Sequence, residues 1–363
     1  MAEDELIENM REKFRAYYAA NLQDKFAELE PVREKYLWKF WIRCALVAGW
    51  FVILFTVLLS GEKSAEEVFG EPAVVMITIL MFCLLGIWIV RPLSAYKKEA
   101  KKAVMDKILK FWGDFGYSDK PGTYVSLGSL EACGLFPRID VQRADDDYRG
   151  IYKEMEITIS EQCLLQEQWI RNNMYYIPVF RGIIIQFEFA KKFAGKTIVC
   201  SGLRGMNAAS LTSVAIGLPM ALAGNKGDLA LGIGSAISGM MAKGKGTDGK
   251  ELQNIKLEDP VFEKKWEVYA TDQVEARYIL TPALMERMLE IKRRFYGKSI
   301  EFSFFDNQVL IAVRTNKDMF ETTSLFTPAL AYHKVQEVVA QFYSVFSAVD
   351  LLAGQKYSKT GEE

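Results

Sequence analysis

The sequence predicts an α+β protein that begins with a two-span transmembrane helical hairpin flanked by cytoplasmic helical arms and continues into a largely antiparallel sheet domain with appended helices. Two uncharged runs near the N-terminus predict the hairpin, and short runs of alternating apolar and polar residues beyond Tyr117 predict the sheet. The 363 residues include 45 Lys and Arg against 46 Asp and Glu. This balance argues against a nucleic-acid partner, which would favour a basic excess.

The first element is an amphipathic helix. Large apolar residues recur there at steps of three or four, which places them on one helical stripe. They are Leu6, Met10, Phe14, Tyr18, Leu22, Phe26 and Leu29. This pattern predicts a cytoplasmic amphipathic helix over residues 1–43.

The second element consists of the two uncharged runs, residues 44–61 and 72–90. At ~1.5 Å per helical residue they measure about 27 and 28 Å, close to the ~30 Å thickness of the hydrocarbon layer. Buried core helices are the alternative, although such helices rarely lack charge over this length. We therefore predict a transmembrane hairpin over residues 44–90.

Charges on either side of the hairpin predict its orientation. Lys and Arg precede the first run and follow the second, whereas the connecting loop is rich in Glu, so both termini are expected in the cytoplasm. Indole rings and Lys side chains at such a boundary can contact the surface of membrane lipid, although ordinary topology signals on a solvated helix are the alternative for the Lys cluster. The expected contacts are Trp38, Trp41, Lys97, Lys98, Lys101 and Lys102.

Beyond the hairpin, residues 91–116 predict a second cytoplasmic helical arm that packs against the first. Residues 117–352 predict the α+β domain, and 353–363 form a polar tail. Period-two runs at 152–159, 183–189 and 299–305 predict strands, the last forming a hairpin with 309–313. Residues 281–295 and 329–352 predict helices, the first opening with a capping Thr and a Pro at the first helical position.

An apolar insert rich in Gly and Ala occupies residues 205–242, with only Lys226 and Asp228 charged. Three interpretations stay open: a helical hairpin that covers the domain, a segment that inserts into the membrane, and a self-association surface. The candidate interaction or insertion residues are Leu211, Ile216, Gly217, Leu218, Met220, Gly224, Ile233 and Met240.

Catalytic and metal-binding patterns are not found in the sequence. The single histidine, His333, excludes sites with two imidazoles, and the five cysteines form no CxxC pair, which favours buried, reduced thiols. Residues 145–147 are three consecutive Asp that lack calcium-loop spacing, so we expect a solvated turn before a strand. We therefore predict no catalytic residue, no metal, no cofactor and no enzymatic activity.

Several stretches are similar to a known family. Residues 134–138, 179–184, 257–263 and above all 268–282 resemble the bacterial membrane-protein family catalogued as domain of unknown function 3137. The resemblance covers roughly residues 107–352 and implies a protein of the bacterial inner membrane without an established activity, with LemA-type membrane proteins as a weak hint of a partner.

The most specific part of this resemblance supplies four family-specific structural residues, for which we expect a Glu–Arg pair that orders a loop, with binding of a partner as the alternative use. They are Asp272, Glu275, Arg277 and Tyr278. The family offers no catalytic residues to transfer.

These observations favour a membrane-anchored, non-enzymatic scaffold that associates with itself or binds another membrane protein. The alternative is a domain that binds or senses lipid at the inner leaflet. An enzyme that uses carboxylates such as Asp272 and Glu275 is the third hypothesis.

Overall fold

The computed structural model describes residues 2–59, 72–118, 124–170, 173–189, 192–200, 251–295 and 299–353. The chain divides into two compact units. We call residues 1–111 together with 320–339 the helical unit, and residues 112–319 together with 340–363 the sheet unit.

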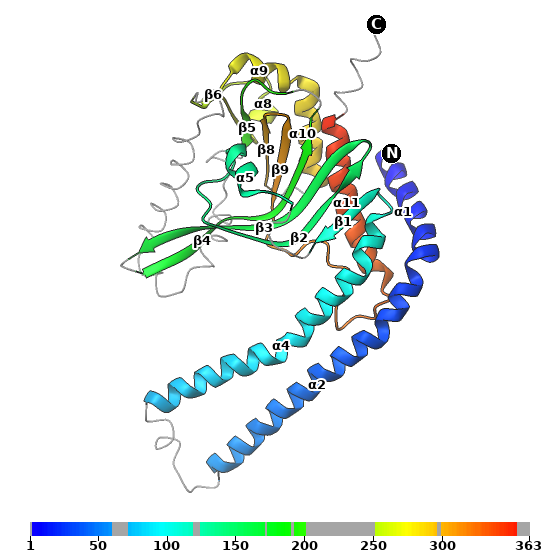
Figure 1. Cartoon of the computed structure of the whole chain (residues 1–363), viewed down its shortest axis with the longest axis vertical. Coiled ribbons are helices and arrows are strands. Elements are labelled where there is room, and N and C mark those ends of the chain that lie inside the picture. The colour runs from blue at the N-terminus through cyan, green and yellow to red at the C-terminus, as the bar shows by residue number, and fades with distance from the viewer. Residues whose placement is uncertain are drawn as a thin grey trace. The chain divides into compact units, whose positions relative to one another are not determined.

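The helical unit is built on α1 (Ala2–Asn21), α2 (Gln23–Leu59) and α4 (Pro72–Leu109). The helices α2 and α4 lie side by side (Figure 1). The Tyr36 hydroxyl donates to the Glu99 carboxylate at 2.8 Å, and the Arg43 guanidinium lies 4.7 Å from the centre of the Trp88 ring. These contacts join the middle of α2 to the middle and second half of α4.

The apolar stripe of the first helix is buried from Phe14 to Leu29. The Phe14 ring packs edge-on against Phe111 at 5.1 Å, and the Tyr17 hydroxyl donates to the Lys107 carbonyl at 2.8 Å. The expected helix 1–43 is divided at Leu22, and its second part continues without interruption to Leu59.

Residues 320–331 belong to the helical unit although they lie far along the sequence. The Ala329 N–H donates to Glu30 at 2.7 Å, and Arg33 donates to the Leu325 carbonyl at 3.0 Å. The Lys101 ammonium donates to Glu321 at 2.8 Å. This irregular segment carries no periodic pattern, so the sequence did not predict its association with α2 and α4.

The predicted two-span transmembrane hairpin is contradicted. Among the helices in the described ranges, none combines the length and the apolar character that crossing a bilayer requires. The predicted spans and the localisation in the inner membrane are therefore wrong. The uncharged runs are not separate helices: they form parts of α2 and α4, whose other parts carry many charges, and residues 60–61 of the first run lie outside the described ranges.

The sheet unit contains an antiparallel sheet whose nine described strands follow the order β1-β2-β3-β4-β9-β8-β5-β7-β6 (Figure 1). The strands are β1 (Asp114–Ser118), β2 (Val141–Tyr152), β3 (Met155–Ile170), β4 (Asn173–Glu188), β5 (Thr197–Cys200), β6 (Gln253–Ile255), β7 (Glu267–Ala270), β8 (Ile300–Phe305) and β9 (Gln308–Arg314). This arrangement agrees with the sheet part of the predicted fold class.

The helices of this unit are short except for the last two. They are α5 (Leu127–Cys133), α8 (Pro260–Glu263), α9 (Gln273–Ile279), α10 (Pro282–Arg294) and α11 (Tyr332–Ala353), of which residues 340–353 belong to the sheet unit. Thr281 caps α10 by accepting from the Leu284 N–H at 3.3 Å, and Pro282 begins the helix, as the sequence predicts.

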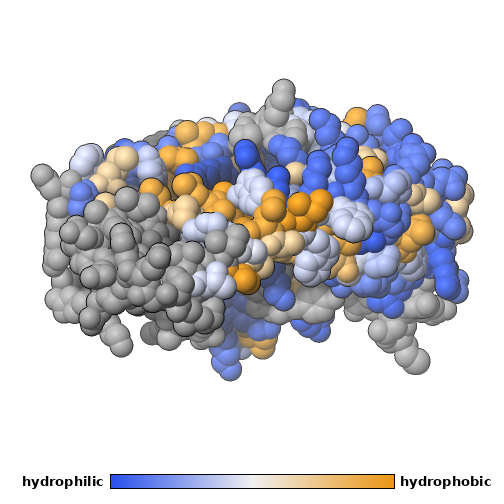
Figure 2. Space-filling view, turned by 90° about the horizontal axis from the view of Figure 1, so that it is seen from below, coloured by the Kyte–Doolittle hydropathy of each residue, from blue (hydrophilic) through white to orange (hydrophobic). Residues whose placement is uncertain are grey.

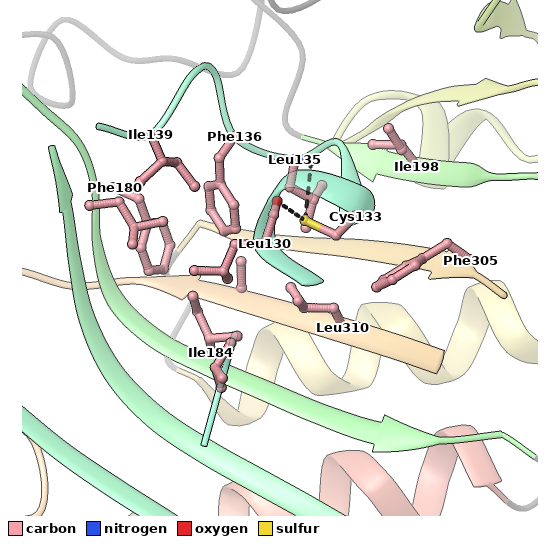
Figure 3. Close-up of a cluster of buried hydrophobic side chains, with 13 residues drawn as sticks. Leu130, Cys133, Leu135, Phe136, Ile139, Phe180, Ile184, Ile198, Phe305 and Leu310 are labelled. Carbon is pink, nitrogen blue, oxygen red and sulfur yellow. Dashed lines mark hydrogen bonds between the residues drawn. The ribbon is translucent and has the colours of Figure 1, made fainter. Parts of the chain in front are cut away.

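Both faces of the sheet are covered. Figure 3 shows the cluster under α5, where Leu130 and Phe136 lie against Phe180, Ile184 and Leu310 of the sheet. On the opposite face, α11 packs its Phe342 ring 5.3 Å from Tyr148 and its Phe346 ring 4.6 Å from Tyr152. Covering on both faces explains why every residue of β8 is buried.

The predicted strands are confirmed in part. The hairpin of β8 and β9 is present, with Phe305 paired to Gln308. The run 152–159 is not one strand, because a turn at Lys153 and Glu154 separates β2 from β3. Both turn residues have positive φ, 47° and 67°, which matches the twist of a tight hairpin.

Candidate interaction surfaces

Large apolar side chains lie exposed along α2 and α4. On α2 they are Trp38, Trp41, Ile42, Leu46 and Val52, and on α4 they are Met76, Leu80, Leu84, Ile87 and Val90; each is 52–70% exposed. We call these ten side chains the helical apolar surface. Most follow steps of three or four residues, the spacing by which one helix packs against another. Figure 2 shows hydrophobic residues gathered in a band on one face of the molecule.

The chemistry of this surface selects an uncharged partner. No charged residue occurs between Cys44 and Leu59 or between Pro72 and Val90. Arg43 lies at the border, where it donates to the Trp88 carbonyl at 2.6 Å. A partner with charges here would lose hydration without gaining ion pairs, so apolar helices fit best.

A second surface lies at the end of the β3–β4 hairpin. In the described sheet, β2 pairs with β3 only up to Leu165, and β9 pairs with β4 only from Gly182 onward. Residues 166–170 and 173–177 therefore form a two-stranded extension, the outer ribbon, which projects from the sheet (Figure 1). The sequence interpretation missed it, although its aromatic residues and uncharged second strand were a signal.

The outer ribbon exposes apolar side chains on one face. Trp169 pairs directly with Met174, and Tyr176 lies two residues further along the strand, so all three share a face. Trp169 is 73% exposed, and Met174 and Tyr176 are each 43% exposed. Isolated exposed apolar residues are common, but three on one projecting face indicate a contact surface.

The apolar pocket of the sheet unit is small. Its volume is about 40 Å³, and it is lined by Phe189, Phe193, Tyr278, Ile279, Leu284, Phe304 and Leu352. Pockets for small molecules usually measure roughly 300–1,000 Å³. This pocket therefore gives no support to a cavity for a lipid chain.

The four family-specific residues lie in or next to α9, but each has different contacts. Asp272 caps α9 by accepting from the Val274 N–H at 2.8 Å. Glu275 accepts from the N–H groups of Ala194 and Gly195, both at 2.7 Å, and so orders that loop through backbone contacts rather than through Arg277. Arg277 and Tyr278 are exposed, the latter beside the small pocket.

The residues expected at a membrane surface have different surroundings. Lys97 and Lys101 both contact Glu321, at 3.2 and 2.8 Å, and Lys101 is only 5% exposed. Lys98 and Lys102 are exposed, and Trp38 and Trp41 belong to the helical apolar surface. The candidate residues of the insert 205–242 lie outside the described ranges.

The described thiols of the sheet core are unsuited to nucleophilic chemistry. Burial raises the pKa of Cys133 to about 12, and burial together with the nearby Glu301 and Glu267 carboxylates raises the pKa of Cys200 to about 12. Such thiols stay protonated at neutral pH, and the thiolate is the reactive form.

The solvated turn expected at residues 145–147 is wrong. These residues lie within β2, at a shift of register between Ala144 and Asp147. Asp146 and Asp147 are buried, where Asp146 accepts from the Tyr117 hydroxyl at 2.8 Å and Asp147 accepts from the Ser160 hydroxyl. No group of three or more metal-binding side chains occurs among the residues that were described.

The fold is that of an antiparallel α+β protein with exposed apolar surfaces. Residues 178–353 match the family model described as "Protein of unknown function (DUF3137)", which confirms the resemblance seen in the sequence. No curated protein matches the chain.

Among solved structures, the chain is similar to the crystal structure of the mycobacterial trehalose monomycolate transport factor A, TtfA. The identity is 11% and the TM-score 0.29, with 67% of this chain and 92% of that chain covered. A likeness at this level carries no argument about fold or function.

Proposed function

We propose that the chain is a non-enzymatic scaffold that associates with itself through the helical apolar surface. The observation that supports this function is the pair of exposed apolar stripes on α2 and α4. Removing such stripes from water favours association at about 25 cal/mol per Å² of apolar area. Binding of a second protein, such as a LemA-type protein, remains a prediction of the family resemblance.

A second copy is a suitable occupant because the surface is helical and carries no charged residue from Cys44 to Leu59 or from Pro72 to Val90. At about 2 kcal/mol per buried Leu and ~25 cal/mol per Å², each side chain contributes roughly 80 Å². Because the ten side chains are 52–70% exposed, they would bury roughly 500 Å² of apolar area on each copy, more than half of the ~800 Å² that each partner buries in a standard stable interface. Two such helical pairs can pack as a four-helix arrangement related by a two-fold axis.

The test uses the full chain in a mild non-ionic detergent, which limits nonspecific aggregation, and measures particle mass by light scattering. The double variant Leu46→Glu/Leu84→Glu places charges in the middle of both stripes. We expect the protein mass per particle to fall at least two-fold. The matched control Val274→Glu changes an apolar side chain that is 79% exposed on α9, and we expect its mass to equal that of the wild type.

Two outcomes would contradict this function. A strictly monomeric wild-type chain would remove the basis for self-association. An equal loss of mass in the control variant would mean that charge alone, rather than the helical apolar surface, controls association. Circular dichroism of each variant checks that the helices persist.

A further inference from the structure

We infer that the outer edge of β4 in the outer ribbon, which pairs with none of the described strands, pairs with the same edge of a second copy, antiparallel, with the two-fold axis at Tyr175. This contact is separate from the helical apolar surface and uses none of its residues. It would join the sheets of two copies edge to edge.

The hydrogen bonds of β3 show which backbone groups point outward. The Asp140 N–H donates to the Leu165 carbonyl at 3.0 Å, and the Glu167 N–H donates to the Asp140 carboxylate at 2.9 Å. Leu165 and Glu167 thus direct their backbone groups away from β4. Because the direction alternates along a strand, Gln166 and Gln168 face β4.

The same alternation applies to β4. Gln166 pairs with Ile177 and Gln168 pairs with Tyr175, so Ile177 and Tyr175 direct their backbone groups towards β3. Met174 and Tyr176 therefore direct their N–H and carbonyl groups to the opposite side. Among the described strands, β9 is the neighbour on that side, and it reaches only Gly182.

The two edges of the ribbon are not equivalent. On the β3 edge, the Asp140 side chain and backbone already occupy groups of Glu167 and Leu165. On the β4 edge, Arg314 donates to the Val179 carbonyl at 2.9 Å, and Pro178 has no N–H. The segment available for pairing on β4 therefore ends at Tyr176.

A second copy fits this short edge because the sequence is self-complementary. With the axis at Tyr175, Met174 of one copy faces Tyr176 of the other, and each facing pair forms two backbone hydrogen bonds, about four in all. Moving the axis to Tyr176 would place Met174 opposite Pro178, which cannot donate. Residues 173–178 carry no charge, so no like charges meet.

The side chains support the same register. Met174 and Tyr176 share a face with Trp169, so each Met thioether would meet an aromatic ring of the other copy. Natural edge strands usually carry Lys or another charge that prevents such pairing. The segment 173–177 has none.

The first experiment is disulfide trapping in the full chain, with the exposed Cys83 replaced by Ser throughout. In Tyr175→Cys the two introduced thiols would face each other as a non-hydrogen-bonded pair, with Cα atoms about 4.5 Å apart, within the range of a disulfide. We expect a covalent dimer on mild oxidation. Asn173→Cys is the matched control, because its thiols would lie more than about 10 Å apart in this register.

The second experiment introduces charged residues on the outer edge of β4. It uses the Leu46→Glu/Leu84→Glu background, so that only contacts outside the helical apolar surface are measured. Met174→Lys/Tyr176→Lys places Lys opposite Lys in both facing pairs, and we expect dimerisation to weaken at least ten-fold. Met174→Lys/Tyr176→Glu places Lys opposite Glu in both pairs, and we expect dimerisation to persist.

Equal trapping of the Asn173→Cys and Tyr175→Cys variants would overturn the proposed register. Equal loss of dimer in the Lys/Lys and Lys/Glu variants would overturn it as well, provided that their circular dichroism matches the parent chain. A parent chain that is monomeric in this background would overturn the contact itself while leaving the proposed scaffold function to its own test.

Discussion

Carboxylates that accept backbone N–H groups hold several irregular segments of this protein in place. Glu275 binds the loop at residues 194–195, and Glu30 binds the segment around Ala329. A charged acceptor makes a stronger hydrogen bond than a neutral one, and its loss leaves backbone donors unsatisfied. The sequence indicated that Glu275 orders a loop but suggested the wrong partner, because a spacing of two residues on a helix does not bring side chains together.

Glu30 gives a prediction about pH. Its hydrogen bond with Arg33 lowers its pKa from 4.5, and the hydrogen bond from Ala329 N–H acts in the same direction. A lowered pKa in the folded state contributes stability above the unfolded value near 4.5, and this contribution is lost as the pH falls through the folded value. We expect Glu30→Gln to destabilise the helical unit by about 1 kcal/mol at pH 7.

The measurement is urea unfolding of wild type and Glu30→Gln at pH 7 and in steps below pH 4.5. The difference between the two proteins should shrink as the pH falls. Glu337→Gln is the control, because this carboxylate lies on the surface with a side chain 58% exposed. A difference between wild type and Glu30→Gln that stays constant with pH would contradict the role of the carboxylate charge.

At the scale of elements, the sequence predicted those strands and helices whose periodicity is local. The β8–β9 hairpin and the capped helix α10 follow directly from alternation and from Thr281-Pro282. The boundary between β2 and β3 was missed because Lys153 and Glu154 adopt positive φ without the Gly or Asn that usually signals such a turn. The turn propensities of Lys and Glu could not predict positive φ at these two residues, because the pairing of β2 with β3 imposes that conformation.

Gly182 marks the point where β4 leaves β9 and continues into the outer ribbon. Its φ is +152°, and an added Cβ would lie 2.0 Å from the Val313 carbonyl oxygen. We expect Gly182→Ala to destabilise the sheet unit by about 2 kcal/mol or more, because backbone atoms would have to move. Chemical unfolding monitored by tryptophan fluorescence measures the loss.

Gly128→Ala serves as the comparison for this substitution. An added Cβ at Gly128 would have its nearest neighbour, the Ser126 hydroxyl, at 3.9 Å, and the residue lies within α5. Ala favours a helix by up to about 1 kcal/mol relative to Gly, so stability should be unchanged or slightly higher. Similar losses for both substitutions would show that the close approach at Gly182 is unimportant.

At the scale of the whole molecule, the helical unit combines two parts that are far apart in the sequence, residues 1–111 and 320–339. Local patterns predicted the long helices, but they suggested independent spans and arms where the structure has two continuous helices packed together. Nothing periodic in residues 320–331 indicated that these residues complete the unit. Contacts of this kind depend on complementary surfaces far apart in sequence, which one sequence does not reveal.

A substitution at Glu321 tests whether its carboxylate holds the segment 320–331 against α4. The Glu321 carboxylate contacts Lys97 and the buried Lys101, so Glu321→Gln should weaken the attachment of the segment to α4. We expect faster amide hydrogen exchange in residues 320–331, by about ten-fold, while exchange in β8 and β9 is unchanged. Uniform exchange changes across the chain would contradict a local role.

This assembly from two separated parts has a consequence for biosynthesis. The ribosome produces α1, α2 and α4 first, but the residues that cover Glu30, Arg33 and Lys101 are made only after the whole of residues 112–319 has been completed. In the nascent chain these groups therefore stay uncovered until residues 320–331 have been synthesised. In a truncated product that ends before Phe320 they would never be covered. An incomplete chain would therefore differ from the complete protein by these uncovered polar groups on α2 and α4.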